Sequence, residues 1–141
     1  MLEQLVPLHP KLVHFPIALF ISALGFELLA YILRKDPFHK TAIYLFTAAA
    51  LMSFVVVQTG LWEQARLHLN HPVLTEHRLY GLWTMWLSLL SLPILWWLRT
   101  FLPKYFRPVF LVVLIAVSVL VFLTAHEGGE MVYEYGVGVE K

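Results

Sequence analysis

The sequence predicts an all-α integral membrane protein: a four-helix bundle with both termini outside the cytoplasm and a short extended C-terminal tail on the outer side. Apolar residues make up 60% of the 141-residue chain, charged residues make up 13%, and the mean hydropathy is +0.73. Soluble domains average roughly half apolar and a quarter charged residues. Four apolar runs each approach the roughly 20 residues that cross a bilayer. They leave no length for a soluble catalytic domain, so residues 1–141 are expected to form one membrane domain.

Local signals indicate where each span begins. Proline is tolerated in the first turn of a helix, where its missing N–H would be unpaired anyway, so Pro16 and Pro108 are expected there. Thr41 is expected to cap the second helix, and Pro72 predicts that the third begins a turn or two before the membrane. The spans are placed near Pro16–Leu33, Thr41–Glu63, Leu79–Leu98 and Pro108–Ala125.

The end of the chain alternates apolar and polar residues and is rich in glycine. Gly128 and Gly129 are therefore expected to end the fourth helix, and residues 127–141 to form an extended tail over the outer mouth of the bundle. Within the third span, Pro93 is expected to kink the helix.

The charged residues predict the topology. Short loops rich in lysine and arginine stay cytoplasmic, and two loops fit this rule, one after the first span and one after the third. Both termini are thereby expected outside. The basic residues of these loops are Arg34, Lys35, Lys40, Arg99, Lys104 and Arg107.

Small and polar residues recur at helical spacing on three of the spans, which predicts closely packed helices. Each of these stripes is expected to face inward, and the first and third end in a histidine at the outer level. The stripes are His14, Ala18, Ser22 and Gly25; Ala49, Ser53 and Gly60; and His77, Gly81, Thr84, Ser88 and Ser91.

Six of the seven histidines fall at the outer end of the spans. Four-helix bundles build cofactor sites from side chains on facing helices, and a haem iron takes one or two imidazoles. His77 and His126 are the preferred axial pair for haem b, with His14 as a substitute or a ligand to a second haem. Since cysteine is absent, disulfides, thiolate metal sites and covalently attached haem are excluded.

Other polar residues are secondary candidates. His9 precedes Pro10 outside the first span, while His68 and His71 lie in the second outer loop; with nearby glutamates they would suit Cu or Zn. Glu27 is the one acid within a span, where acids often belong to proton relays. It is alternatively expected to reach the inner surface or pair with Arg34 or Lys35. His39 is expected to be solvated.

Two motifs, taken together, resemble the signatures of domain-of-unknown-function family 2231, a family of bacterial four-span membrane proteins. One is HPKLVHFPIAL from His9, and the other is GGEMVYEYGVGV from Gly128. The resemblance covers essentially the whole chain and implies the fold and a location in the bacterial inner membrane. The resemblance also implies a link to redox work, because similar modules occur beside c-type cytochrome domains in some proteins. His14 matches the first motif, His77 matches a histidine near the start of the third span, and His126 resembles the form in cytochrome-associated members.

Three functions remain open. The first is a small b-type cytochrome that passes electrons between quinone or a membrane partner, such as a cytochrome, and an outer-side acceptor. The second is an outer-face Cu or Zn binding protein. The third is a structural or assembly subunit of a larger membrane complex, or a homodimer, without cofactor. Nucleic-acid binding has no support, because the basic residues are few and lie at the membrane edge.

Overall fold

The computed structural model describes residues 8–68 and 71–136, and helices make up nearly all of these. Four helical segments are long and apolar enough to cross a membrane, as expected: His9–Leu33, Asp36–Arg66, Pro72–Phe101 and Pro103–Tyr133. The helices are α1 (His9–Leu12), α2 (His14–Leu33), α3 (Asp36–Leu67), α4 (Pro72–Phe101) and α5 (Pro103–Tyr133).

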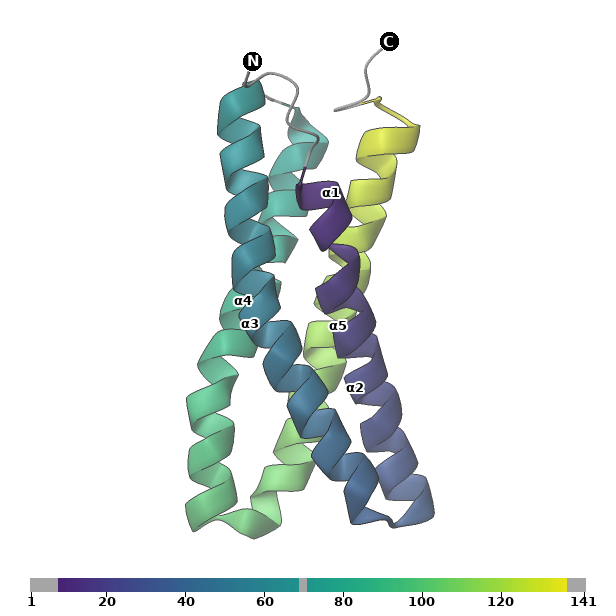
Figure 1. Ribbon diagram of the computed structural model, residues 1–141, viewed down its shortest axis with the longest axis vertical. Helices are drawn as coiled ribbons and strands as arrows, with labels where there is room; N and C mark the ends of the chain where they lie inside the picture. Colours follow the sequence, from purple (N-terminus) through teal and green to yellow (C-terminus); the bar gives the residue numbers. More distant parts are fainter. Residues whose placement is uncertain (1–7, 69–70, 137–141) are drawn as a thin grey trace.

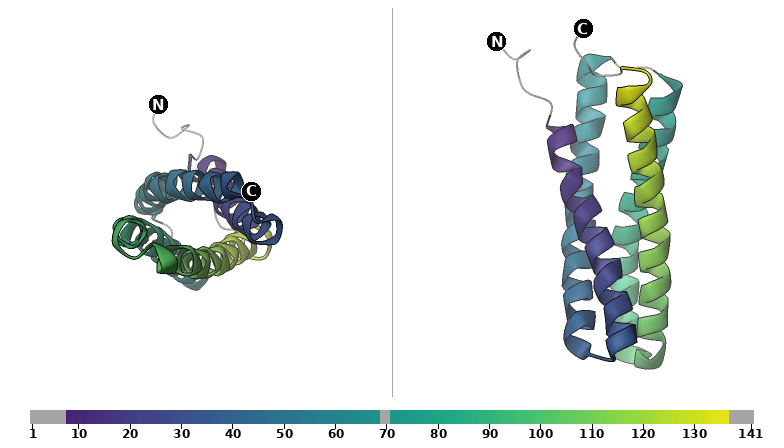
Figure 2. Two further views of the ribbon diagram at one scale, coloured as in Figure 1. Left: turned by 90° about the horizontal axis from the view of Figure 1, so that it is seen from below. Right: turned by 90° about the vertical axis from the view of Figure 1, so that its right-hand side faces the viewer.

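The four long helices form an up-and-down bundle of two layers. α2 packs chiefly on α3, and α4 on α5, so that each layer is one antiparallel hairpin (Figures 1 and 2). The short helix α1 lies against α3, at the end of the bundle where α3 and α5 end and α4 begins. We call this the terminal end. The opposite end, with the basic α2–α3 and α4–α5 connections, is the basic end.

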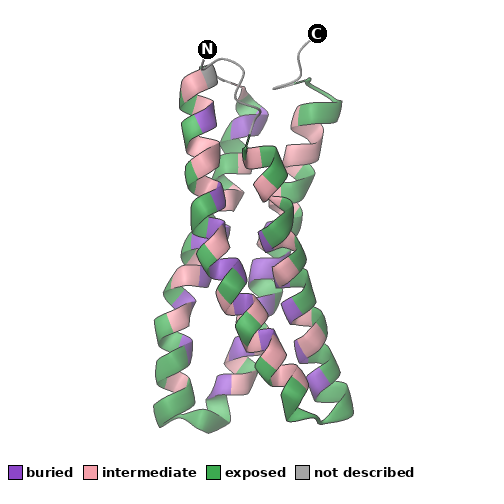
Figure 3. Ribbon diagram, viewed as in Figure 1, coloured by how far each residue is buried: buried purple, intermediate pink, exposed green. Residues whose placement is uncertain are grey.

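The core runs along the middle of the bundle, where aromatic and small side chains from both layers meet (Figure 3). Phe20, Phe46 and Phe110 form edge-to-face pairs, with ring centroids 5.7 and 5.5 Å apart. Alanines at positions 23, 49 and 50 are fully buried beside them. Buried hydroxyl groups mostly donate to carbonyl oxygens of their own helix, as that of Ser88 does to the oxygen of Met85 at 3.1 Å, which satisfies them without water.

Several predicted helix ends were wrong, in each case because the helix is longer than the apolar run. α3 begins at Asp36, with Pro37 in its first turn, and Thr41 instead bonds back to the oxygen of Pro37 at 3.0 Å. α5 begins at Pro103, so Pro108 lies inside it. α4 does begin at Pro72, and the ring of His71 accepts from the Val73 N–H at 3.3 Å.

The tail was also predicted wrongly over its first part. Residues 127–133 continue α5 as helix through Gly128 and Gly129, and the Glu134 N–H closes the last turn on the oxygen of Glu130 at 3.0 Å. Glycine costs a helix only about 1 kcal/mol, and Gly128 fits closely beside a histidine ring of α4. The part of the predicted tail from 137 to 141 lies outside the described residues.

The predicted inward stripe of the first span was on the wrong face. His14, Ala18, Ser22 and Gly25 are exposed on the outside of α2. The buried face instead carries Phe20, Ala23, Glu27 and Ala30. Glu27 explains which face of α2 is buried, since a carboxylate in a membrane helix must turn away from lipid toward partners.

Candidate functional site

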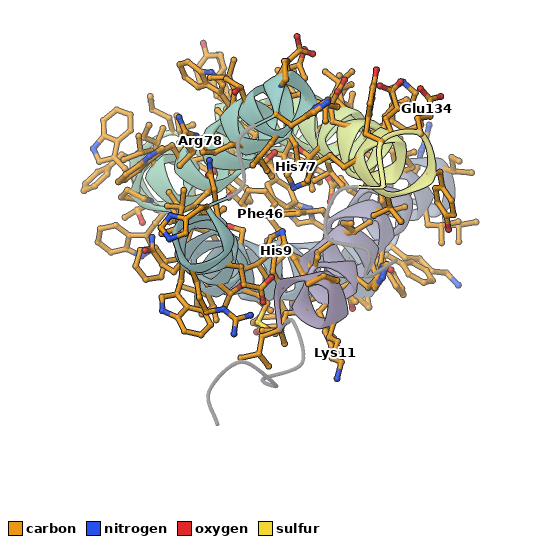
Figure 4. All side chains as sticks on the ribbon, turned by 90° about the horizontal axis from the view of Figure 1, so that it is seen from above. His9, Lys11, Phe46, His77, Arg78 and Glu134 are labelled. Carbon is orange, nitrogen blue, oxygen red and sulfur yellow. The ribbon has the colours of Figure 1, made fainter. Side chains whose placement is uncertain are left out.

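Two histidines meet inside the terminal end of the bundle, one from each layer. His9 comes from α1, which is joined to the α2–α3 layer, and His77 comes from α4. Their ring centroids are 6.0 Å apart and their planes are nearly perpendicular, at 88°. Viewed from the terminal end in Figure 4, both side chains point into the space between the layers. We call these two residues the histidine pair.

Each ring is oriented by a hydrogen bond to the backbone of a neighbouring helix, α3 for His9 and α5 for His77. His9 Nδ1 lies 2.9 Å from the carbonyl oxygen of Val56, and His77 Nδ1 lies 2.9 Å from that of Thr124. A carbonyl oxygen only accepts, so Nδ1 must carry the proton in both rings. In the neutral rings the lone pair is therefore on Nε2. This is the tautomer that metal-bound histidines commonly adopt, with the other ring nitrogen donating to a carbonyl or carboxylate.

Two glycines make room for the histidine pair. A Cβ atom at Gly60 of α3 would lie 2.9 to 3.3 Å from ring atoms of His9, and one at Gly128 of α5 would lie 3.2 to 3.3 Å from the ring of His77. Both contacts are closer than ordinary van der Waals distance. The sequence thus places the smallest residue opposite each ring, and the rings are confined between helices.

Glu63 fixes the position of α1. Its side chain is buried, and Oε1 accepts hydrogen bonds from the backbone N–H groups of Leu8, at 2.5 Å, and His9, at 3.0 Å. N–H groups in the first turn of a helix have no partner within it, and a carboxylate is their strongest acceptor. Glu63 therefore ties the short helix that carries His9 to α3.

The pair differs from the predicted ligand set. The histidine beside His77 is His9, a secondary candidate by sequence. His14 is exposed. The His126 side chain is 58% exposed, and its Nε2 lies 3.1 Å from Glu130 Oε1 one helical turn away. A signal for His9 was present, since it lies in the HPKLVH motif. The missed information was that helical structure begins as early as His9, in α1, and that α1 packs against α3.

A second polar cluster lies in the half of the bundle nearer the basic end. Glu27 is completely buried; its Oε2 lies 2.6 Å from His39 Nδ1 and its Oε1 3.3 Å from Arg107 Nε. These three residues, the Glu27 cluster, join α2, α3 and α5. The expectations that His39 is solvated and that Glu27 pairs with Arg34 or Lys35 or reaches the inner surface were wrong. A desolvated carboxylate requires partners inside the bundle, and α3 and α5 supply them as His39 and Arg107.

The order of the helices along the chain explains one of the two partners of Glu27 but not the other. Glu27 and His39 stand on either side of one short connection between antiparallel helices, which brings them to similar depth. Arg107 is 80 residues away from Glu27, and only the packing of α5 against α2 brings them together.

In the described part of the chain, no group of three or more His, Cys, Asp or Glu side chains is placed to hold a metal ion. The histidine pair by itself supplies two imidazole ligands.

The steric role of Gly60 predicts a measurable effect. Gly60→Ala is expected to lower the free energy of unfolding by about 1–2 kcal/mol, because the added methyl group overlaps a ring that Val56 and Glu63 hold in place. Gly25→Ala is the control, since nothing lies within 4 Å of its Cβ position and alanine is the better helix former. Thermal unfolding in one detergent compares the two; equal stability of both variants would contradict the proposed confinement of His9.

The helices and their composition define a multi-pass membrane protein of the four-helix type. The chain belongs to the family described as predicted membrane protein (DUF2231), which matches residues 5–141. No curated protein and no solved structure matches the chain.

Proposed function

We propose that this protein is a small membrane b-type cytochrome in which His9 and His77 are the axial ligands of one haem. The observation that carries the proposal is the histidine pair itself: two imidazoles from opposite layers, each with its Nδ1–H given to a backbone carbonyl. Four of the six ligands of a haem iron come from the porphyrin, so two imidazoles complete the set.

The spacing of the rings fits this use. Two imidazoles can hold one haem iron only if their rings lie close together inside the bundle. The centroids of His9 and His77 are 6.0 Å apart. One imidazole comes from each layer, so His9 and His77 would hold the group from the two layers together.

The residues around the pair hold it ready for a ligand. The carbonyls of Val56 and Thr124 place the lone pair of each neutral ring on Nε2, Gly60 and Gly128 allow the rings to sit deep between helices, and Glu63 anchors α1. Such supporting hydrogen bonds also raise the basicity of a ligating imidazole. When bound, haem would supply one-electron transfer. We infer quinone or a membrane cytochrome as one redox partner and an acceptor at the terminal end as the other.

The basic residues also indicate how the protein is oriented in the membrane. The basic end carries the lysines and arginines of the α2–α3 and α4–α5 connections, which favours the cytoplasmic side of a bacterial inner membrane for it. The histidine pair would then lie near the outer, periplasmic surface.

The test is spectroscopy of the detergent-purified protein from cells supplied with haem. We expect a Soret band, sharp α and β bands after dithionite reduction, and a pyridine haemochrome of haem b. A colourless protein would refute the cytochrome proposal. Metal analysis would then decide between a Cu or Zn protein and a subunit without cofactor.

A further inference from the structure

An apolar groove opens between α3, α4 and α5 near the basic end. Its volume is about 240 Å³. In Figure 1 the lower half of α4 diverges from α3 in this region. The Glu27 cluster joins α2, α3 and α5 in this half of the bundle and includes no residue of α4. The residues that line the groove are Ile43, Phe46, Thr47, Leu92, Leu95, Trp96, Arg99, Phe106 and Phe110.

The interior of the groove offers little to a polar group. Eight of its nine lining residues are uncharged, and the hydroxyl of Thr47 donates to the carbonyl oxygen of Ile43 in its own helix at 2.8 Å. Phe106 and Phe110 form a stacked wall, with centroids 5.8 Å apart, that separates the groove from His39 on the other side. A hydrocarbon chain suits these walls better than a ring with several carbonyl groups to satisfy.

A single positive charge lies at the groove. Arg99 is exposed in the last turn of α4, and within residues 8–68 and 71–136 it forms no ion pair or hydrogen bond. It stands at the end of the span, where lipid headgroups meet the protein. An arginine fork is well matched to a phosphate, and basic pockets between membrane helices bind anionic lipid headgroups.

We propose that this groove is a binding site for one anionic phospholipid, with an acyl chain against Phe46, Phe106 and Phe110 and the phosphate group paired with Arg99. The lipid fills the space that the divergence of α4 leaves open, because apolar walls facing the bilayer gain dispersion contacts only from a hydrocarbon occupant. This proposal does not depend on haem binding.

Native mass spectrometry of the full chain tests it, with phosphatidylglycerol and phosphatidylcholine of identical acyl chains in competition. We expect one phosphatidylglycerol to be retained with about fivefold preference, the factor that corresponds to roughly 1 kcal/mol for one basic residue near the membrane surface. Arg99→Gln should abolish the preference, while Arg99→Lys should keep most of it. Lys35→Gln is the matched control, since Lys35 is also exposed at the basic end but does not line the groove.

A second variant tests the acyl chain. Thr47→Phe is expected to fill part of the groove and to reduce retention of both lipids, at unchanged helix content by circular dichroism. The proposal is overturned if the wild type retains both lipids equally, or if Arg99→Gln keeps the preference. It is also overturned if Lys35→Gln loses as much as Arg99→Gln, because the lipid would then be bound only by the general charge of this end.

Discussion

His77→Ala is expected to eliminate six-coordinate haem from the purified protein, and His9→Ala is expected to do the same. Each removes one of the two imidazoles that we propose as axial ligands, and among the other histidines, His71 packs on Tyr135 and His14 and His126 are exposed. The reduced protein should lose its sharp α band. The measurement is the reduced-minus-oxidised spectrum together with the haem-to-protein ratio.

The controls are the other two histidines that the sequence suggested. His14 and His126 are exposed on the outside of the bundle, so His14→Ala and His126→Ala should leave the spectrum unchanged. If His126→Ala removed the α band while His9→Ala kept it, the ligand pair that we propose from the structure would be wrong and the pair predicted from sequence would be favoured.

Gly128→Ala is expected to weaken haem retention without removing it, because it displaces the ring of His77 but leaves the ligand present.

Glu27→Leu is expected to lower the free energy of unfolding by about 3 kcal/mol. Removal of one partner of a buried ion pair typically costs about 3–5 kcal/mol, because the other charge stays buried and unpaired. The lower figure applies here because the Arg107 side chain is 31% exposed and can turn its head group toward the membrane surface. Its Nη2 atom already lacks a hydrogen-bond partner and is buried, so loss of the carboxylate leaves the guanidinium poorly satisfied.

Denaturant unfolding in mixed micelles, followed by circular dichroism, measures this effect. Glu130→Leu is the matched control, because Glu130 pairs with the exposed His126 one turn away, and such pairs on a helix surface typically contribute about 0.3–0.5 kcal/mol. A Glu27→Leu protein as stable as the wild type would mean that the Glu27 cluster does not hold α2, α3 and α5 together.

The fold class was predictable because membrane helices follow from composition alone. A bilayer leaves backbone groups without water, so each apolar run of sufficient length must become a helix, and all four spans are present. The exact ends were less predictable. Polar turns such as 127–133 extend α5 beyond its apolar run, because helix continuation depends on local hydrogen bonds as well as on hydropathy.

The sequence by itself determined that this is a four-helix membrane protein, that histidines gather at one end of it, and that His77 is among the candidates for a site. Only the tertiary structure selected His9 as the neighbour of His77 and placed His39 and Arg107 on Glu27. The physical reason is that spans of similar composition do not specify their rotation or their neighbours. The rotation and the neighbours of each helix are decided by particular contacts between distant residues. These are the hydrogen bonds that buried carboxylates such as Glu63 and Glu27 accept, and the glycines that leave space for a ring from another helix.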